Sequence, residues 1–78
     1  MNKVIIYSTP TCPYCQLAKE FFKENNVEYD DFNVAEDAKA REEMIKKSGQ
    51  MGVPVIEIGK DIVVGFDKNK LTELLGIK

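Results

Sequence analysis

Two cysteines are the residues of this chain best suited to chemistry. Cys12 and Cys15 are the only cysteines in the sequence, and Pro13 and Tyr14 separate them. Because proline favours the first position of a helix, Pro13 places Cys12 just before a helix and Cys15 about one turn into it. Two thiols at this spacing on a helix can reach disulfide distance with little backbone movement. The spacing therefore predicts a pair that forms and breaks a disulfide.

The start of the helix would also make Cys12 the attacking thiol. The first backbone N–H groups of a helix have no partner within it, and together with the helix dipole they favour an anion. The thiolate is the nucleophilic form of cysteine, so we predict that Cys12 attacks and that Cys15 resolves the mixed disulfide. Lys19 lies about two turns beyond Cys12 on the helix, and we expect a solvated side chain that contributes little. The alternative is that both cysteines are small buried hydrophobic residues, which would leave the proline between them unexplained.

The composition argues against several other classes of protein. The chain has 78 residues, of which 44% are hydrophobic and 31% charged, as expected for one globular domain spanning residues 1–78. Eleven basic and thirteen acidic residues give a net charge of −2 without a basic stripe, which argues against a nucleic-acid partner. The apolar runs are far shorter than the ~20 residues of a membrane span, and the run after Lys3 is too short for a signal peptide. We expect a cytoplasmic monomer without membrane contact, in which a CxxC pair is catalytic or metal-binding rather than a structural disulfide.

Four strands and three helices are predicted, in the order β-α-β-α-β-β-α. The expected strands are residues 3–7, 27–32, 53–58 and 61–64, which are rich in β-branched and aromatic residues. The expected helices begin at Pro13, near Asn33 and after Asp67, and the first two end near residues 24 and 48. The first strand–helix–strand unit implies a parallel pair, and a hairpin turning at Gly59-Lys60 adds antiparallel strands. The result is an α/β fold with a small mixed sheet flanked by helices.

The polar middle of residues 27–32 places that strand at the edge of the sheet. Asn33, followed three residues later by Glu36, predicts the start of the second helix, and Gly49 suits its end. Glu43 and Lys47, like Glu42 and Lys46, are spaced as ion pairs on its surface. Apolar residues at helical spacing predict the buried faces of the three helices: Leu17, Ala18, Phe21 and Phe22; Ala38, Met44 and Ile45; Leu71, Leu74 and Leu75.

The chain as a whole resembles the glutaredoxins, which belong to the thioredoxin-like superfamily. The resemblance covers nearly all of the sequence. It rests on Tyr7-Ser8 before Cys12-Pro13-Tyr14-Cys15, on Val53-Pro54 about forty residues later, and on Gly65-Phe66-Asp67 before the last helix. It implies a thioredoxin-like fold with four strands and three helices, and a dithiol enzyme that reduces protein disulfides or mixed disulfides with glutathione. It implies no tightly bound cofactor, and glutathione as a candidate co-substrate.

The resemblance also implies roles for residues outside the cysteine motif. It implies that Pro54 is cis and lies beside the cysteines, so that the backbone of Val53 can pair with an extended substrate. It further implies that glutathione contacts Tyr14 beside Pro13, the Val53 backbone and the turn at Gly65-Phe66-Asp67. The residues alone leave other roles open, because Phe66 could equally fill the core and Asp67 could cap the last helix.

Three departures from the glutaredoxin pattern leave the electron donor open. Many glutaredoxins have a lysine where this chain has Thr9, and a basic residue shortly before Val-Pro, where this chain has Gln50-Met51-Gly52. Both cations would pair with a carboxylate of glutathione. The usual Gly-Gly before the last helix is Val64-Gly65, and Gly65-Phe66 is similar to redoxins that reduce ribonucleotide reductase and are recharged by thioredoxin reductase. Glutathione and thioredoxin reductase are therefore both candidate donors.

Two other classes of function compete with the enzyme. Two cysteines without histidine supply half of a tetrahedral zinc site, which a dimer could complete, and some glutaredoxins hold an iron–sulfur cluster between subunits. Pro13 stiffens the loop beside Cys12 and, by analogy with the family, works against such a cluster, so we expect no metal ligands. A purely structural interaction domain would instead leave both thiols unreactive at neutral pH.

Overall fold

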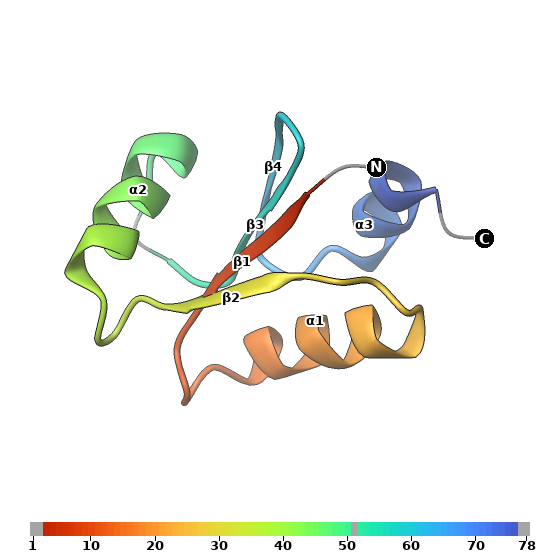
Figure 1. Ribbon diagram of the computed structural model, residues 1–78, viewed down its shortest axis with the longest axis horizontal. Helices are drawn as coiled ribbons and strands as arrows, with labels where there is room; N and C mark the ends of the chain where they lie inside the picture. The colour runs from red at the N-terminus through yellow and green to blue at the C-terminus, as the bar shows by residue number, and fades with distance from the viewer. Residues whose placement is uncertain (1–2, 51, 77–78) are drawn as a thin grey trace.

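The computed structural model describes residues 3–50 and 52–76. Seven elements follow one another in the predicted order: β1 (Val4–Ser8), α1 (Pro13–Glu24), β2 (Asp30–Asn33), α2 (Ala38–Ser48), β3 (Val55–Ile58), β4 (Asp61–Val64) and α3 (Lys68–Leu75). The strands form one sheet in the order β2-β1-β3-β4 (Figure 1). β1 is parallel to β2 and antiparallel to β3, and β3 is antiparallel to β4. The predicted α/β architecture, with a mixed sheet and β2 at its edge, is confirmed.

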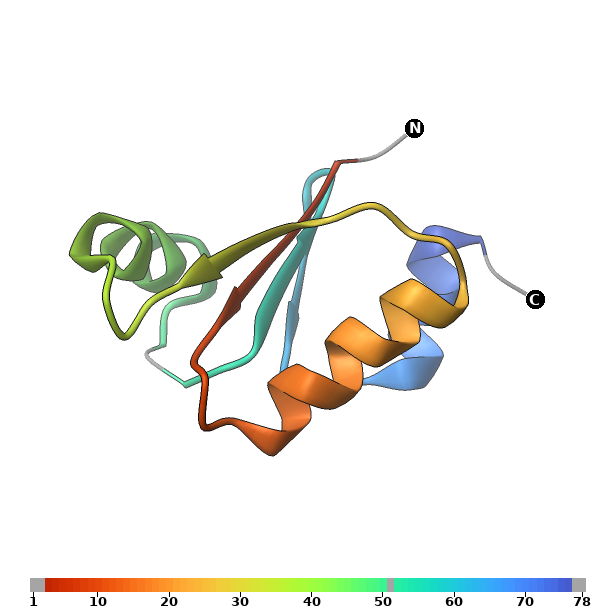
Figure 2. The same ribbon diagram turned by 60° about the horizontal axis from the view of Figure 1, so that its bottom comes forward.

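Helices cover both faces of the sheet. α1 and α3 lie against one face and α2 against the other (Figure 2). The alternation of side chains along each strand supplies the two cores. In β1, Val4 and Ile6 point toward α1 and α3, whereas Tyr7 points toward α2. On the α1 side the buried residues are Val4, Ile6, Ala18, Phe21, Phe22, Ile56, Ile58, Val63 and Leu71; on the α2 side they are Tyr7, Val34, Ala40, Met44 and Val55.

The ends of α1 follow from the residues at its boundaries. Cys12 is the N-cap and Pro13 is the first helical residue, where its missing N–H costs nothing. Asn25 caps the other end, and Asn26 takes a left-handed conformation with φ of 57°. Asparagine tolerates this region better than most residues. Both predicted ends of α1 are therefore confirmed.

The predicted start of α2 is wrong by several residues. The Asn33 side chain accepts the N–H of Ala35 at 3.0 Å and stabilises a turn instead of a helix. The helix is capped by Asp37, whose carboxylate accepts the N–H of Ala40 at 3.0 Å. This later start leaves Ala38 exposed and gives the buried position to Ala40.

Other predicted details also need correction. β2 begins at residue 30 and β3 at residue 55, so both are shorter than predicted. Leu17 is 44% exposed, and Cys15 takes its place on the buried face of α1. Lys47 pairs with Glu57 of β3, at 2.9 Å, rather than with Glu43 on its own helix. The burial of Cys15 and the partner of Lys47 depend on how each helix packs against the sheet.

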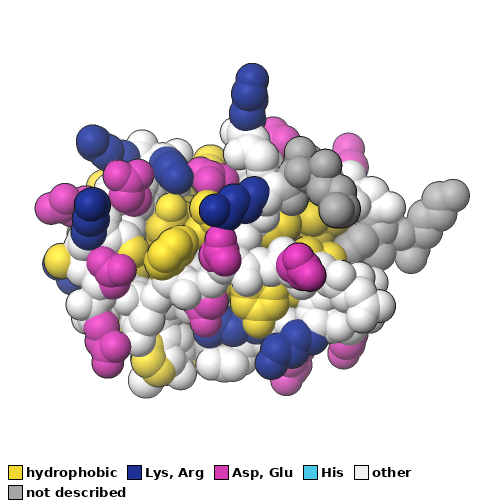
Figure 3. All heavy atoms as spheres, in the orientation of Figure 1, with side chains coloured by type: hydrophobic (Ala, Val, Ile, Leu, Met, Phe, Trp, Pro, Cys, Tyr) yellow, Lys and Arg dark blue, Asp and Glu magenta, His cyan; other side chains and the backbone are white. Residues whose placement is uncertain are grey.

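The surface fits the small net charge of the chain. Basic and acidic side chains are interspersed over the face drawn in Figure 3. Within residues 3–50 and 52–76, no helix has the length and the apolar character needed to cross a membrane.

We predict that the buried Phe22 contributes much more to stability than the partly exposed Phe32. Phe22 is fully buried, whereas Phe32 is 38% exposed and stacks on Tyr7 with ring centroids 5.8 Å apart. Phe22→Ala should lower the free energy of unfolding by about 3–5 kcal/mol, because it leaves a cavity in the core. Phe32→Ala should lower it by about 1 kcal/mol. Urea unfolding measures both values.

Phe22→Leu extends this test if Phe22→Ala does not fold, and it should fall between the wild type and Phe22→Ala. Equal losses for Phe22→Ala and Phe32→Ala would contradict the assignment of the core.

Candidate active site

Cys12 lies at the end of the sheet where the chain leaves β1 and enters α1. Its Sγ accepts the backbone N–H of Cys15 at 3.2 Å, as a side chain at the N-cap of a helix does. As a thiol it also lies 3.8 Å from the carbonyl oxygen of Val53, to which it can donate. The residue is partly exposed. The Cys12 sulfur is therefore within reach of solvent and contacts a helix N–H that favours its anion.

Cys15 has the opposite environment. It is fully buried in the first turn of α1, and both cysteines are free thiols in the structure. Burial, followed by a hydrogen bond with the Cys12 side chain, raises the pKa of Cys15 to about 12. A hydrogen bond with the Thr9 backbone and the charge of Lys19 act in the opposite direction. At neutral pH the structure therefore holds Cys15 as a neutral thiol beneath Cys12.

The start of β3 lies beside Cys12. The Val53–Pro54 peptide bond is cis, as the resemblance implied, and Pro54 is buried. The carbonyl of Pro54 accepts the N–H of Gly65 at 2.8 Å, which ties this segment to the residues that follow β4. Gly65 has φ of 83°, a left-handed conformation that glycine adopts without strain. The structure thus links Cys12, Val53, Pro54 and Gly65 through direct contacts.

The remaining predicted site residues divide between surface and core. Pro13 and Tyr14 follow Cys12 on the exposed side of α1, and the Tyr14 side chain is 62% exposed. Phe66 is partly buried, and its ring meets that of Phe21 edge-on, with centroids 6.1 Å apart. Asp67 is the N-cap of α3 and accepts the N–H of Lys70 at 3.1 Å. The side chains of Phe66 and Asp67 are therefore engaged by the core and by the helix cap.

The positions that depart from the glutaredoxin pattern are described in part. Thr9 lies in the loop before Cys12, where its carbonyl accepts the Cys12 N–H at 3.4 Å. Met51 lies outside the described residues. Among the described residues, no group of three or more His, Cys, Asp or Glu side chains is placed to hold a metal ion.

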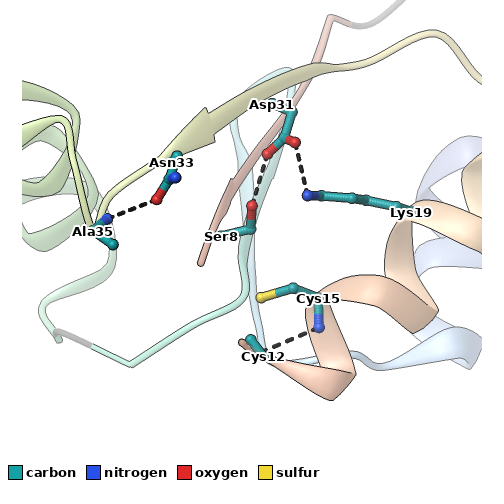
Figure 4. Close-up of polar contacts among 7 residues, drawn as sticks. All are labelled: Ser8, Cys12, Cys15, Lys19, Asp31, Asn33 and Ala35. Carbon is teal, nitrogen blue, oxygen red and sulfur yellow. Dashed lines mark hydrogen bonds and ion pairs between the residues drawn. The ribbon is translucent and has the colours of Figure 1, made fainter. Parts of the chain in front are cut away.

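Sequence reasoning missed a polar network beside the cysteines. The Ser8 hydroxyl, at the buried end of β1, donates to Asp31 Oδ1 at 2.7 Å, and Lys19 Nζ lies 2.7 Å from Asp31 Oδ2 (Figure 4). The Lys19 side chain is only 19% exposed, so the expectation of a solvated lysine is wrong. The spacing of Cys15 and Lys19, four residues apart on one helix, indicated that the two side chains are neighbours, but it did not point to Asp31 or Ser8.

The arrangement of strands and helices defines the class of protein first. The structure is similar to that of a mutant of the thioredoxin-like protein BC3987, with a TM-score of 0.93 and 40% identity over the whole of both chains. It is also similar to a glutaredoxin from Archaeoglobus fulgidus, with a TM-score of 0.87 and 31% identity over 96% of this chain and 87% of that one. The fold is therefore thioredoxin-like.

Sequence comparison then identifies the family within this class. The glutaredoxin family model matches residues 4–63. An uncharacterised glutaredoxin-like 8.6 kDa protein of the rubredoxin operon of Clostridium pasteurianum is 53% identical over 90% of this chain and 93% of its own. Glutaredoxin 3 of Escherichia coli is 40% identical over 86% of this chain and 81% of its own. This chain belongs to the glutaredoxin family and is a thiol–disulfide oxidoreductase with a redox-active cysteine pair.

We predict that the two thiols differ sharply in their reactivity with an alkylating agent. In Cys12→Ser, alkylation of Cys15 should be slow at neutral pH and should rise up to about tenfold per pH unit, without a plateau, to about pH 9. The reason is that burial, the largest cause of the raised pKa of Cys15, remains when Cys12 is replaced. Cys12 in Cys15→Ser should react much faster near pH 7. Mass spectrometry of the alkylated protein measures both rates.

The two variants serve as controls for each other, since each retains one thiol. A Cys15 rate that levels off below about pH 9 would show that the thiol is not held neutral by burial.

Proposed function

We propose that this chain reduces protein disulfides and mixed disulfides with glutathione through Cys12-Pro13-Tyr14-Cys15. The observation that carries the proposal is the asymmetry of the pair. Cys12 is partly exposed and its sulfur accepts a helix N–H, whereas Cys15 is buried and neutral. A dithiol reductase needs one thiolate that substrate can reach and one thiol that remains in reserve.

The reaction proceeds by two successive displacements at sulfur. The Cys12 thiolate attacks one sulfur of the substrate disulfide, and the other sulfur leaves with the electron pair and takes a proton from solvent. Cys15 then loses its proton to solvent and attacks Cys12 Sγ, which releases the second substrate sulfur as a thiolate. The substrate gains two electrons and the enzyme is left with a Cys12–Cys15 disulfide. A donor must then return two electrons to the enzyme.

Residues around Cys12 would position the substrate. We place the substrate backbone against Val53, whose carbonyl lies 3.8 Å from the Cys12 sulfur. Tyr14, exposed beside Pro13, provides an apolar wall. The hydrogen bond between Gly65 and Pro54 brings the turn at residues 65–67 to the same edge. Because the side chains of Phe66 and Asp67 are engaged elsewhere, that turn would contact glutathione through its backbone.

We propose that both glutathione and thioredoxin reductase can recharge the enzyme. The family is typically linked to glutathione, which supports the first donor. The uncharged Thr9 and Gln50, together with Gly65-Phe66, favour the second. Both donors suit a reducing compartment, so we place the protein in the cytoplasm. We further propose that it acts as a monomer of one domain.

Trapping tests the assignment of the two thiols. Cys15→Ser should accumulate a mixed disulfide between Cys12 and a protein substrate, because nothing resolves it. Cys12→Ser should accumulate little, since its remaining thiol is buried. Non-reducing gel electrophoresis and mass spectrometry measure the adduct. Accumulation in Cys12→Ser but not in Cys15→Ser would reverse the two roles.

A donor experiment tests the second part of the proposal. Oxidised protein should be reduced both by glutathione and by thioredoxin reductase with NADPH, followed as loss of the Cys12–Cys15 disulfide by mass spectrometry of the alkylated protein. Thr9→Lys should lower the KM for glutathione about tenfold, because the added cation can pair with a carboxylate of glutathione. It should leave the rate with thioredoxin reductase unchanged.

Thr9→Gln is the matched control, because it lengthens the side chain without adding charge. Failure of either donor to reduce the wild type would restrict the enzyme to the other. An equal gain for Thr9→Gln and Thr9→Lys would argue against an ionic contact.

A further inference from the structure

We infer that Lys19, held in place by Asp31 and Ser8, is a positioning residue for the second displacement. Its ammonium group stabilises the negative charge that Cys15 acquires when it attacks the mixed disulfide. The inference rests on the proposed function, in which Cys15 is the resolving thiol. It concerns a separate step from the attack by Cys12 and can be tested separately.

The geometry places Lys19 on the same face of α1 as Cys15. Residues four apart on a helix are neighbours on its surface, and this face packs against the sheet. Ser8 ends β1 on the side that faces α1, and Asp31 belongs to the neighbouring strand β2. Figure 4 shows the Lys19 side chain extending from α1 to the Asp31 carboxylate, with Ser8 on its other oxygen. Both carboxylate oxygens are therefore occupied, which fixes the direction of the lysine side chain.

Burial makes such a cation useful. Cys15 has no exposed surface, and an unpaired anion is costly in such a place. The groups that act on its charge are Cys12 just before α1, Lys19 on α1 and the Thr9 backbone in the loop after β1. Asp31 of β2 lies behind Lys19 as its ion-pair partner. Cys12 opposes the thiolate only while it is a free thiol, since it carries no charge in the mixed disulfide, whereas Lys19 and the Thr9 backbone favour the thiolate. Among these, Lys19 supplies the positive charge.

The size of the effect follows from the chemistry of thiols. Lys19 is one of the groups that lower the pKa of Cys15, so loss of its charge reduces the fraction of Cys15 that is thiolate at neutral pH. A thiolate of higher pKa is also more nucleophilic. With a Brønsted coefficient of about 0.5, a tenfold fall in the thiolate fraction is partly offset by a roughly threefold gain in the reactivity of the thiolate that remains. For a tenfold fall in the thiolate fraction, the second displacement should therefore slow by about threefold.

An aromatic disulfide that releases a coloured thiolate in each displacement separates the two steps. In stopped-flow measurements with the reduced protein, the first release depends on disulfide concentration and reports on Cys12. The second is intramolecular, independent of that concentration, and reports on Cys15. Lys19→Met keeps the apolar stem of the side chain without its charge. It should slow the second release about threefold to tenfold and leave the first within about twofold.

The pH profile distinguishes this role from a structural one. Both wild type and Lys19→Met should show a second release that rises with pH between about pH 6 and about pH 9, because burial, the largest cause of the raised pKa of Cys15, remains when Cys12 is part of the mixed disulfide. The ratio of the two rates should therefore be constant across it. Lys19→Arg, which keeps the charge, should restore most of the rate. The matched control is Lys23→Met, which removes an exposed lysine one turn further along α1 and should change neither release.

The double variant Lys19→Met/Asp31→Asn tests the cause. Loss of Lys19 alone uncovers the Asp31 carboxylate, which would itself oppose a thiolate nearby. If the missing cation matters, the second release stays slow when both charges are removed. Recovery of the wild-type rate in the double variant would overturn the inference, as would an unchanged second release in Lys19→Met.

Other outcomes separate this inference from the proposed function. If the wild type gives no first release, or gives no second, the proposed dithiol mechanism fails and the inference falls with it. A normal wild type with a second release that ignores Lys19 overturns the inference alone. Circular dichroism establishes that each variant is folded; if Lys19→Met is not, Lys19→Gln takes its place in every comparison.

Discussion

The start of α1 is the constraint on which the active site depends. Cys12 is the last residue before the helix and Cys15 lies in its first turn, so a single boundary gives the two thiols opposite surroundings. The N–H of Cys15 points at the Cys12 sulfur at 3.2 Å, while the packing of α1 on the sheet buries the Cys15 side chain. A shift of the helix start by one residue would place different side chains in both positions. Pro13 favours the observed start, because proline suits the first helical position.

Local signals in the sequence were enough for most of this architecture. The order of elements, the hairpin at residues 59–60 and both ends of α1 follow from residues that act on their immediate neighbours. The burial of Cys15 does not follow in this way, because the apolar pattern of the helix favoured Leu17 and the packing of α1 on the sheet buries Cys15 instead. The cis bond before Pro54 is different, because the residues alone permit either isomer and the resemblance to glutaredoxins supplied the expectation.

Contacts between distant residues account for what the sequence did not predict. Asp31 lies twelve residues after Lys19, and the pair forms because the register of β1 and β2 turns Asp31 toward α1. A pattern of charges along the chain does not fix that register. The error at α2 has a different origin, because Asn33 is a good cap by residue type but its side chain stabilises a turn, and Asp37 caps the helix four residues later.

The place of β2 in the sheet has a consequence for the behaviour of concentrated protein. β2 and β4 are the outer strands, so each leaves one row of backbone N–H and C=O groups free to pair with a strand of another molecule. Asp30 and Asp31 open β2, and Asp61 opens β4. Charged side chains on an outer strand, here Asp30 and Asp31 with their partners Lys3 and Lys19, make it a poor template for the strand of another molecule. The carboxylate that anchors Lys19 thus lies on a strand that also helps to keep the molecules apart.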